Sequence, residues 1–170
     1  SIDSYTINDN NALNISINST SINNVTCHDA CDGTIGVNVT GGVPNIDPSG
    51  NPVYVYLWDD VLAQSTSTAI GLCVNNGTNQ TIYTCVVTDA QGCTETISYT
   101  LTQPEELIAL ADIVTPINCN GGSNGELEAS ATGGTPGYDF MWNDATPTAL
   151  NSGLSTGSYV VIVEDANDCL

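Results

Sequence analysis

Apolar and polar residues alternate along several short segments of this chain, as they do in β-strands that bury one face. In residues 34–40 every second side chain is apolar, and residues 126–132 repeat the alternation. A Gly-Gly pair, which suits a tight turn, follows each segment directly. The apolar residues are mostly Val, Ile, Leu and Ala among Thr, Ser, Asn and Gly, a mixture that favours strands and offers little to helices. The pattern predicts an all-β chain.

These segments belong to an internal repeat. Trp58 and Trp142 fall at matching points of the two copies, as one large aromatic residue in each. Short strands, glycine-rich turns and one such residue per copy predict two tandem Ig-like antiparallel β-sandwich modules. Three pairs of segments match in order: 27–42 with 119–134, 56–60 with 140–144, and 83–93 with 159–169.

We expect the modules to occupy residues 13–103 and 104–170, preceded by an N-terminal strand within 1–12. The first copy is longer because it carries insertions at 45–52 and 75–80.

The order of residues within each copy resembles the SprB-type repeat of Bacteroidetes gliding-motility adhesins. The resemblance rests on the series Cys, Asp-Gly, Thr-Gly-Gly, Tyr-x-Trp, Leu and Tyr-x-Val-x-Val-x-Asp-Ala-x-x-Cys, and it covers residues 24–103 and 113–170. It implies a very large, secreted cell-surface β protein that forms filaments or adheres. It carries no catalytic residues across.

The charge and cysteine content of the chain limit its possible binding partners and its location. The chain has no Lys or Arg against 19 Asp and Glu, for a formal charge of −19. Without basic residues it cannot neutralise phosphates, which argues against nucleic acid and anionic lipid as partners. No apolar run approaches the roughly 20 residues of a membrane span, so we expect no membrane insertion. Seven cysteines predict an oxidising, extracellular or cell-surface location and disulfide-stapled modules.

The two copies suggest how the cysteines pair. Cys27 and Cys93 recur as Cys119 and Cys169, which predicts one shared bridge in each copy, Cys27–Cys93 and Cys119–Cys169. Two further cysteines are both replaced by serine in the second copy and are therefore expected to be partners. They are Cys31 and Cys73.

Cys85 remains, and its counterpart is Val161. We expect a free thiol that acts as a small apolar core residue. A bridge to Cys73 and an intermolecular bridge are the alternatives.

The ends of the chain are complementary. Residues 94–101 alternate as a closing strand of the first copy, whereas the second copy stops at Leu170 before that strand. The N-terminus carries a similar segment, because Ser4-Tyr5-Thr6 repeats residues 98–100. In one interpretation a donor strand with Ile2, Tyr5 and Ile7 completes the second module of a neighbouring copy, which makes a head-to-tail fibre. In the other, 170 residues are one period of a longer tandem array.

Few residues are candidates for catalysis or metal binding, and we expect neither an enzyme nor a cofactor. Cys27-His28-Asp29 contains the residue types of a catalytic triad, but neighbours on a strand point to opposite faces. A glycosidase needs two carboxylates in a cleft, for which small sandwiches offer no obvious place. Calcium binding is a more serious option than glycoside hydrolysis, since carboxylates near loops are calcium ligands, although solvated turn residues are the default interpretation. The candidates are Asp59, Asp60, Asp89 and Asp165.

Glycans are a further expectation, N-linked at Asn-x-Ser/Thr sequons or O-linked at Ser or Thr. The six sequons lie at Asn14, Asn18, Asn24, Asn38, Asn76 and Asn79. The aromatic residues of the repeat could also stack on sugars, although repetition of the Trp at one strand position favours core packing. They are Trp58, Trp142, Tyr56 and Tyr138.

Two functions remain. The first is a structural subunit of an extracellular filament built from copies of this chain. The second is a cell-surface adhesin whose modules bind a carbohydrate or a host or neighbour surface.

Overall fold

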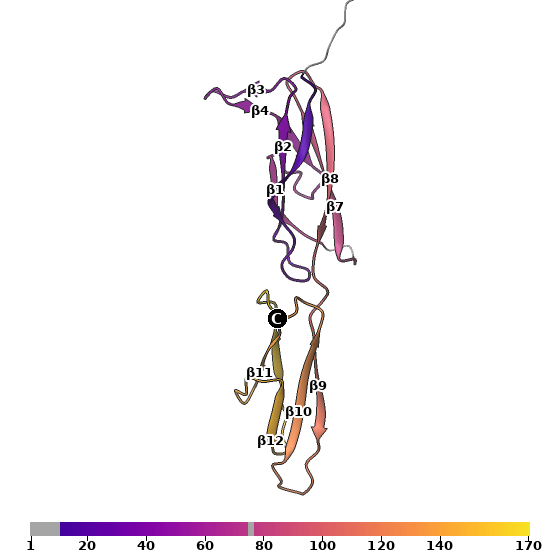
Figure 1. The fold of residues 1–170 in the computed structure, drawn as a ribbon, viewed down its shortest axis with the longest axis vertical. Coiled ribbons are helices and arrows are strands. Elements are labelled where there is room, and N and C mark those ends of the chain that lie inside the picture. The colour runs from indigo at the N-terminus through magenta and orange to yellow at the C-terminus, as the bar shows by residue number, and fades with distance from the viewer. Residues whose placement is uncertain (1–10, 75–76) are drawn as a thin grey trace, which may run out of the picture. The chain divides into compact units, whose positions relative to one another are not determined.

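A computed structural model describes residues 11–74 and 77–170, and every regular element in this part of the chain is a β-strand (Figure 1). The predicted all-β fold class is therefore confirmed. Residues 1–10 lie outside the described part, and with them Ile2, Tyr5 and Ile7 of the expected donor strand. None of the described residues forms a helix long and apolar enough to span a membrane.

The chain forms two compact units. Unit 1 comprises the residues up to Val25 together with Cys31–Thr102, and unit 2 comprises Thr26–Ala30 together with Gln103–Leu170. The loop Thr26–Ala30 thus belongs to unit 2, although it lies inside the range 13–103 expected for the first module. The reason is local bonding: the Asp29 amide donates to Oε1 of Gln103 at 3.0 Å, and Cys27 is bonded to Cys169.

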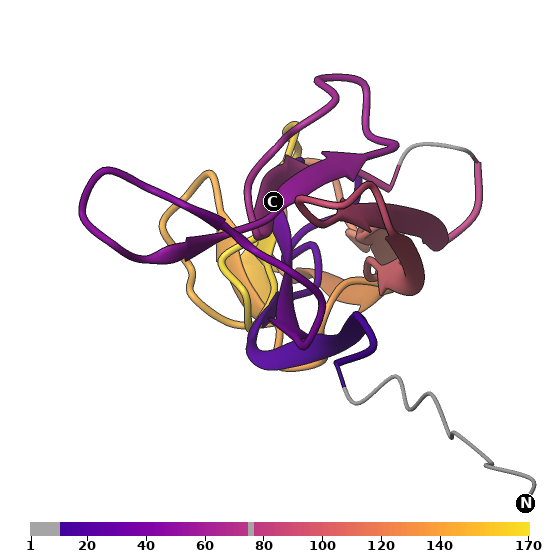
Figure 2. The same cartoon turned by 90° about the horizontal axis from the view of Figure 1, so that it is seen from above.

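Unit 1 is a sandwich of two antiparallel sheets, in the orders β1-β2-β6 and β5-β7-β8. The β3–β4 hairpin is formed by the predicted insertion and extends from the body of the unit in both views (Figures 1 and 2). The strands are β1 (Asn14–Asn23), β2 (Gly33–Thr40), β3 (Asn45–Ile46), β4 (Pro52–Val53), β5 (Val55–Trp58), β6 (Thr68–Leu72), β7 (Gln80–Thr88) and β8 (Thr94–Thr102).

Unit 2 repeats this architecture with fewer strands. Its sheets have the orders β12-β10-β9 and β11-β13. The pairing registers also repeat: Gly125 of β10 lies opposite Leu154 of β12, as Gly33 of β2 lies opposite Leu72 of β6. The strands are β9 (Ile108–Thr115), β10 (Gly125–Thr132), β11 (Asp139–Trp142), β12 (Leu150–Leu154) and β13 (Val161–Glu164).

Each core is organised around its tryptophan. Trp58 is 2% exposed and Trp142 is 1% exposed, and each indole N–H donates to a backbone carbonyl at 2.9 Å, of Thr66 and Thr148 respectively. A buried indole needs such an acceptor. Neither ring is accessible for stacking on a sugar, so the repeated Trp is a core residue.

Candidate functional site: an open sheet edge and an apolar pocket in unit 2

The two units differ most at the pairing of one strand, which is β7 in unit 1 and β13 in unit 2. In unit 1, β7 pairs with β5 on one side and with β8 on the other, in an unbroken register from Gln80↔Thr102 to Thr88↔Thr94. In unit 2, β13 pairs with β11 alone among the described residues. One edge of β13 therefore presents backbone N–H and C=O groups that unit 1 satisfies with a strand, and such an edge is a template for strand addition.

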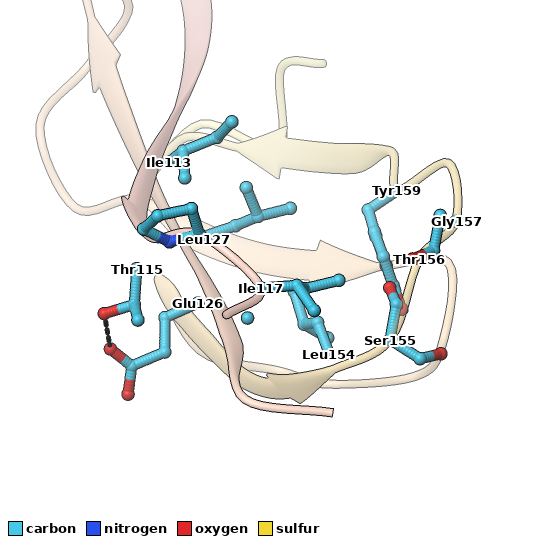
Figure 3. A pocket seen from close by; sticks show the side chains of 12 residues that line it. Ile113, Thr115, Ile117, Glu126, Leu127, Leu154, Ser155, Thr156, Gly157 and Tyr159 are labelled. Atoms are coloured by element: carbon cyan, nitrogen blue, oxygen red, sulfur yellow. Dashed lines mark hydrogen bonds between the residues drawn. The ribbon is translucent and has the colours of Figure 1, made fainter. Parts of the chain in front are cut away.

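Unit 2 also has an apolar pocket, which is lined in part by the loop that leads into β13. It has a volume of about 320 Å³, and Figure 3 shows Leu127, Ile117 and Leu154 pointing into it, with Tyr159 on the side of the loop after β12. At its rim the hydroxyl of Thr115 donates to Oε2 of Glu126 at 2.6 Å. The lining combines β9, β10, the end of β12, the loop between β9 and β10, and the loop between β12 and β13. The wall is largely apolar, so an apolar side chain is the occupant it favours.

In unit 1 the corresponding position is filled by Leu101 of β8. A Cβ atom built on Gly33 would lie only 2.6 Å from Cδ2 of Leu101, so this side chain rests directly on the glycine. Leu101 is completely buried, and so is Ile35, two residues after Gly33 on β2. Gly125 and Leu127 are the counterparts of Gly33 and Ile35 in the repeat.

Without a counterpart of Leu101, the core of unit 2 is less covered. Leu127 is only half-buried, whereas its counterpart Ile35 is not exposed at all. Ile113, opposite Leu127 in the register of β9 with β10, is 71% exposed. The pocket is thus the place that the closing strand occupies in unit 1.

Sequence reasoning missed the residues that line this pocket. It identified the missing strand but did not ask which core position that strand fills. The usable signal was the gap-free alignment of residues 27–42 on 119–134, which places Gly125 on Gly33. A glycine kept at a buried strand position marks a close approach by another group.

The cysteine pairing departs from the prediction in one respect. Cys27 is bonded to Cys169, with 5.8 Å between their Cα atoms, and Cys93 and Cys119 are free and exposed. The expected pairs Cys27–Cys93 and Cys119–Cys169 are therefore wrong. Cys31 is bonded to Cys73, the two residues that are replaced together in the second copy.

Strand direction explains why the first and last cysteines of a copy do not meet. The amide of Val25, two residues before Cys27, donates to the carbonyl of Thr102 at the end of β8, while Cys93 precedes the start of β8. A nine-residue strand spans about 30 Å, whereas a disulfide needs Cα atoms within about 7 Å.

The same separation holds in unit 2. Cys119 follows β9 at the Gly125 end of β10, whereas the turn that holds Cys169 accepts a hydrogen bond from Thr135, beyond the other end of β10. First and last cysteines of one copy lie at opposite ends of the module.

Cys85 is a free thiol, and it is buried opposite Trp58 in the pairing of β5 with β7. Burial raises the pKa of its thiol to about 11. It is therefore an inert core group at neutral pH.

The candidate calcium ligands serve the turns. Asp89 accepts hydrogen bonds from the amides of Val43, Gln91 and Cys93, at 2.9 Å in each case. The amide of Val43 is the main reason why the pKa of Asp89 is lowered. Asp60 accepts from the Gln64 amide in the same manner.

Asp165 occupies the equivalent turn of unit 2. Its partners are the amides of Thr135, Asn167 and Cys169, at 2.7 to 3.0 Å. Burial opposes ionisation of this carboxyl, but the three amides outweigh burial and lower its pKa. Asp59 accepts from the amide of Thr84 at 2.8 Å. Over the residues that the structure describes, no group of three or more His, Cys, Asp or Glu side chains could hold a metal ion.

The triad residue types do not form a nucleophilic site. Cys27 is oxidised in its disulfide, and His28 lies with Nδ1 3.2 Å from the carbonyl oxygen of Pro104 and Nε2 3.7 Å from Oδ1 of Asp29. A half-buried histidine beside a cystine has no thiolate to activate.

The glycosylation candidates occupy different environments. Asn14, Asn24 and Asn38 are exposed, and Asn18 and Asn79 are half-buried. Asn76 lies outside the described residues. Modification of all six stays a prediction.

Fold and site together define a class: an all-β repeat protein of two disulfide-bonded antiparallel sandwiches, the second of which has one sheet edge that no other described strand pairs with. The family model of the SprB repeat matches residues 19–63 and 111–147, one match beginning in each copy, which confirms the resemblance seen in the sequence. SprB repeats are adhesin-type repeats that occur in cell-surface proteins. No curated protein matches the chain.

Proposed function

We propose that this protein is the structural subunit of an extracellular filament or cell-surface fibre, assembled head to tail by strand complementation. The N-terminal strand of one copy pairs with the open edge of β13 in another copy. The observation that carries the proposal is the pocket at Gly125, together with the unpaired edge of β13, at the position where unit 1 holds β8 and Leu101.

The N-terminal segment has the residues for this role. Ser4-Tyr5-Thr6 repeats Ser98-Tyr99-Thr100 of β8, and continuing the same offset of 94 puts Ile7 on Leu101. By the register of β7 with β8, Ile7 would pair opposite Gly157, one of the residues that line the pocket. Full burial of one such side chain contributes about 1.5–3 kcal/mol, beside the backbone hydrogen bonds of the new strand pair.

Assembly by backbone and apolar contacts suits a chain with only one sign of charge. Each copy carries −19, so copies repel one another and no Lys or Arg is present for an ion pair between them. A strand inserted at an edge with an apolar side chain in a pocket needs no opposite charge. In this proposal the protein has a structural role outside the cell and no catalytic one.

A pair of matched variants tests the proposal. Ile7→Asp places a carboxylate where the pocket is apolar, while Thr6→Asp adds the same charge at a position whose counterpart, Thr100, is exposed. We expect wild type and Thr6→Asp to form fibres in negative-stain electron micrographs and large species in sedimentation velocity. Ile7→Asp should remain monomeric.

A synthetic peptide of residues 1–10 supplies a second measurement. Added in excess to Ile7→Asp, it should bind to the open unit 2 and raise the midpoint of its thermal unfolding, whereas a peptide with the Ile7→Asp change should not. Fibres that form equally in both variants would overturn strand complementation. Monomers of wild type that bind a glycan array would instead favour an adhesin.

A further inference from the structure

Each cysteine of the Cys27–Cys169 disulfide has an equivalent cysteine in the other copy of the repeat. Cys27 lies in the loop between β1 and β2, and Cys119 lies in the corresponding loop between β9 and β10. Cys169 ends the turn after β13, and Cys93 ends the corresponding turn after β7. The structure thus contains one complete bridge and, separately, one further copy of each partner.

The turns that hold Cys93 and Cys169 are built alike. The amide of Cys169 donates to Oδ1 of Asp165 at 3.0 Å, and the amide of Cys93 donates to Oδ1 of Asp89 at 2.9 Å. The backbone amides of Asp165 and Asp89 donate in return to the carbonyls of Cys169 and Cys93, both at 3.0 Å. Cys93 is therefore held in the backbone setting that presents Cys169 to its partner.

What differs is the loop that covers the sulfur. In unit 2 the loop Thr26–Ala30 lies over Cys169: Nδ2 of Asn167 donates to the carbonyl of Thr26 at 3.1 Å, and Cys169 is 9% exposed. Cys93 and Cys119 are both exposed free thiols. Cys85, by contrast, is buried and has no counterpart in the bridge.

We propose that Cys119 of one copy forms a disulfide with Cys93 of the next copy in the fibre, the same bond that Cys27 and Cys169 form within one chain. The two thiols lose two protons and two electrons to an external small-molecule or protein disulfide, which is reduced to two thiols. The bond formed is Sγ–Sγ between the copies.

The inference rests on the proposed head-to-tail order, and the two contacts agree on direction. Within the chain, the module that follows β8 in sequence is the one that supplies Cys169 to the loop cysteine of the preceding copy of the repeat. Between chains, the copy that donates its N-terminal strand to unit 2 carries, in its own unit 1, the Cys93 that would meet Cys119 of that unit 2. A strand and a covalent bond would then link the same two neighbours.

Peptide mapping of wild-type fibres tests the bond directly. Fibres are alkylated to block free thiols and digested without reduction, and we expect a cross-linked pair of peptides that contain Cys93 and Cys119. On a non-reducing gel the fibres should give a ladder of covalent multimers that collapses to one band on reduction. Alkylated Cys93 and Cys119 in intact fibres would overturn the bond while leaving strand complementation in place.

Single variants then define the partners. Cys93→Ser and Cys119→Ser should each lose the ladder, and the control Cys85→Ser should keep it. When Cys93→Ser and Cys119→Ser are mixed under oxidising conditions, the product should stop at a heterodimer of one copy of each. Homodimers of either variant alone in equal yield, or a Cys93–Cys119 bond inside one wild-type chain, would contradict the proposal.

Electron microscopy of the same samples separates the two proposals. Fibres of Cys93→Ser without covalent multimers mean that the strand assembles the fibre and the disulfide locks it. Absence of fibres in wild type would remove the proposed function itself, whatever the gel shows.

Discussion

Units 1 and 2 are two copies of one module. Apart from the inserted β3–β4 hairpin of unit 1, they differ in one described strand, β8. With β8 present, Leu101 rests on Gly33 and Ile35 is fully buried. Where β8 has no counterpart among the described residues, an apolar pocket borders Gly125 and Leu127 is only half-buried. The comparison shows that the closing strand contributes a core side chain as well as a hydrogen-bonded edge. Among the described residues unit 2 has neither contribution, and in the proposed fibre one incoming strand would supply both.

The largest expected effect comes from removing that core side chain in unit 1. Leu101→Ala should lower the free energy of unfolding of unit 1 by about 2–5 kcal/mol, because it deletes a buried leucine and leaves a cavity. Thr100→Ala, at the exposed neighbouring position, should change it by less than about 0.5 kcal/mol.

Urea unfolding in a Trp142→Phe background measures this, since Trp58 then reports on unit 1 alone. A loss below about 1 kcal/mol for Leu101→Ala would mean that the closing strand is not part of the core, against the cost usual for such a deletion. The pocket of unit 2 could then not be interpreted as the site of a missing core side chain.

Much of this comparison could be read from the sequence. Alternation in residues 34–40 and 126–132 predicted β2 and β10, and residues 94–101 predicted β8 almost to its end. These elements follow from the period of two along a strand, which one sequence displays. The shared loss of two cysteines likewise suggested Cys31–Cys73.

The rest depends on direction and volume. The comparison of copies showed that Cys27 and Cys119 are equivalent. It did not show that strand polarity separates Cys27 from Cys93 in the first copy and Cys119 from Cys169 in the second. The pocket beside Gly125 is likewise an empty space in the core. No residue of the sequence corresponds to an empty space, so the sequence alone does not reveal it. The local pattern predicted the strands. Cysteine pairing across a whole module depends on how those strands run in three dimensions.

A smaller effect distinguishes the two glycines. A Cβ on Gly33 would lie 2.6 Å from Cδ2 of Leu101 and 2.9 Å from the carbonyl oxygen of Leu72. On Gly125 the nearest atom would be the carbonyl oxygen of Leu154, at 3.0 Å, with Ile117 next at 3.2 Å. Gly33→Ala should therefore destabilise unit 1 by about 1–3 kcal/mol through overpacking, and Gly125→Ala should destabilise unit 2 by less.

The same urea experiment, with Trp58→Phe for unit 2 and Trp142→Phe for unit 1, compares the glycines. Addition of the 1–10 peptide should enlarge the cost of Gly125→Ala toward that of Gly33→Ala, because Ile7 would then occupy the space of Leu101. Equal costs without peptide would show that unit 2 is as tightly filled as unit 1.

The smallest effect is a dependence on pH that both units should share. The pKa of Asp89 and the pKa of Asp165 are lowered in the folded state, chiefly by backbone amides that donate to each carboxylate. The unfolded state therefore takes up protons first as the pH falls through the ordinary value near 3.8. The stability that these groups contribute is complete above that value and is lost as the pH falls through their folded pKa.

Asp165→Asn should flatten the acid limb of the stability curve of unit 2 below about pH 4, relative to wild type. The control is Asp168→Asn in the same turn, because it removes the same charge but leaves the three amide bonds of Asp165 in place. This control matters because the chain carries −19, so that protonation of other carboxylates relieves repulsion and raises stability on the same limb. Thermal unfolding in a Trp58→Phe background, followed by Trp142 fluorescence between pH 3 and 7, gives both curves. If the two variants lose stability in acid alike, the turn amides do not set the pH response, and general charge repulsion governs both units.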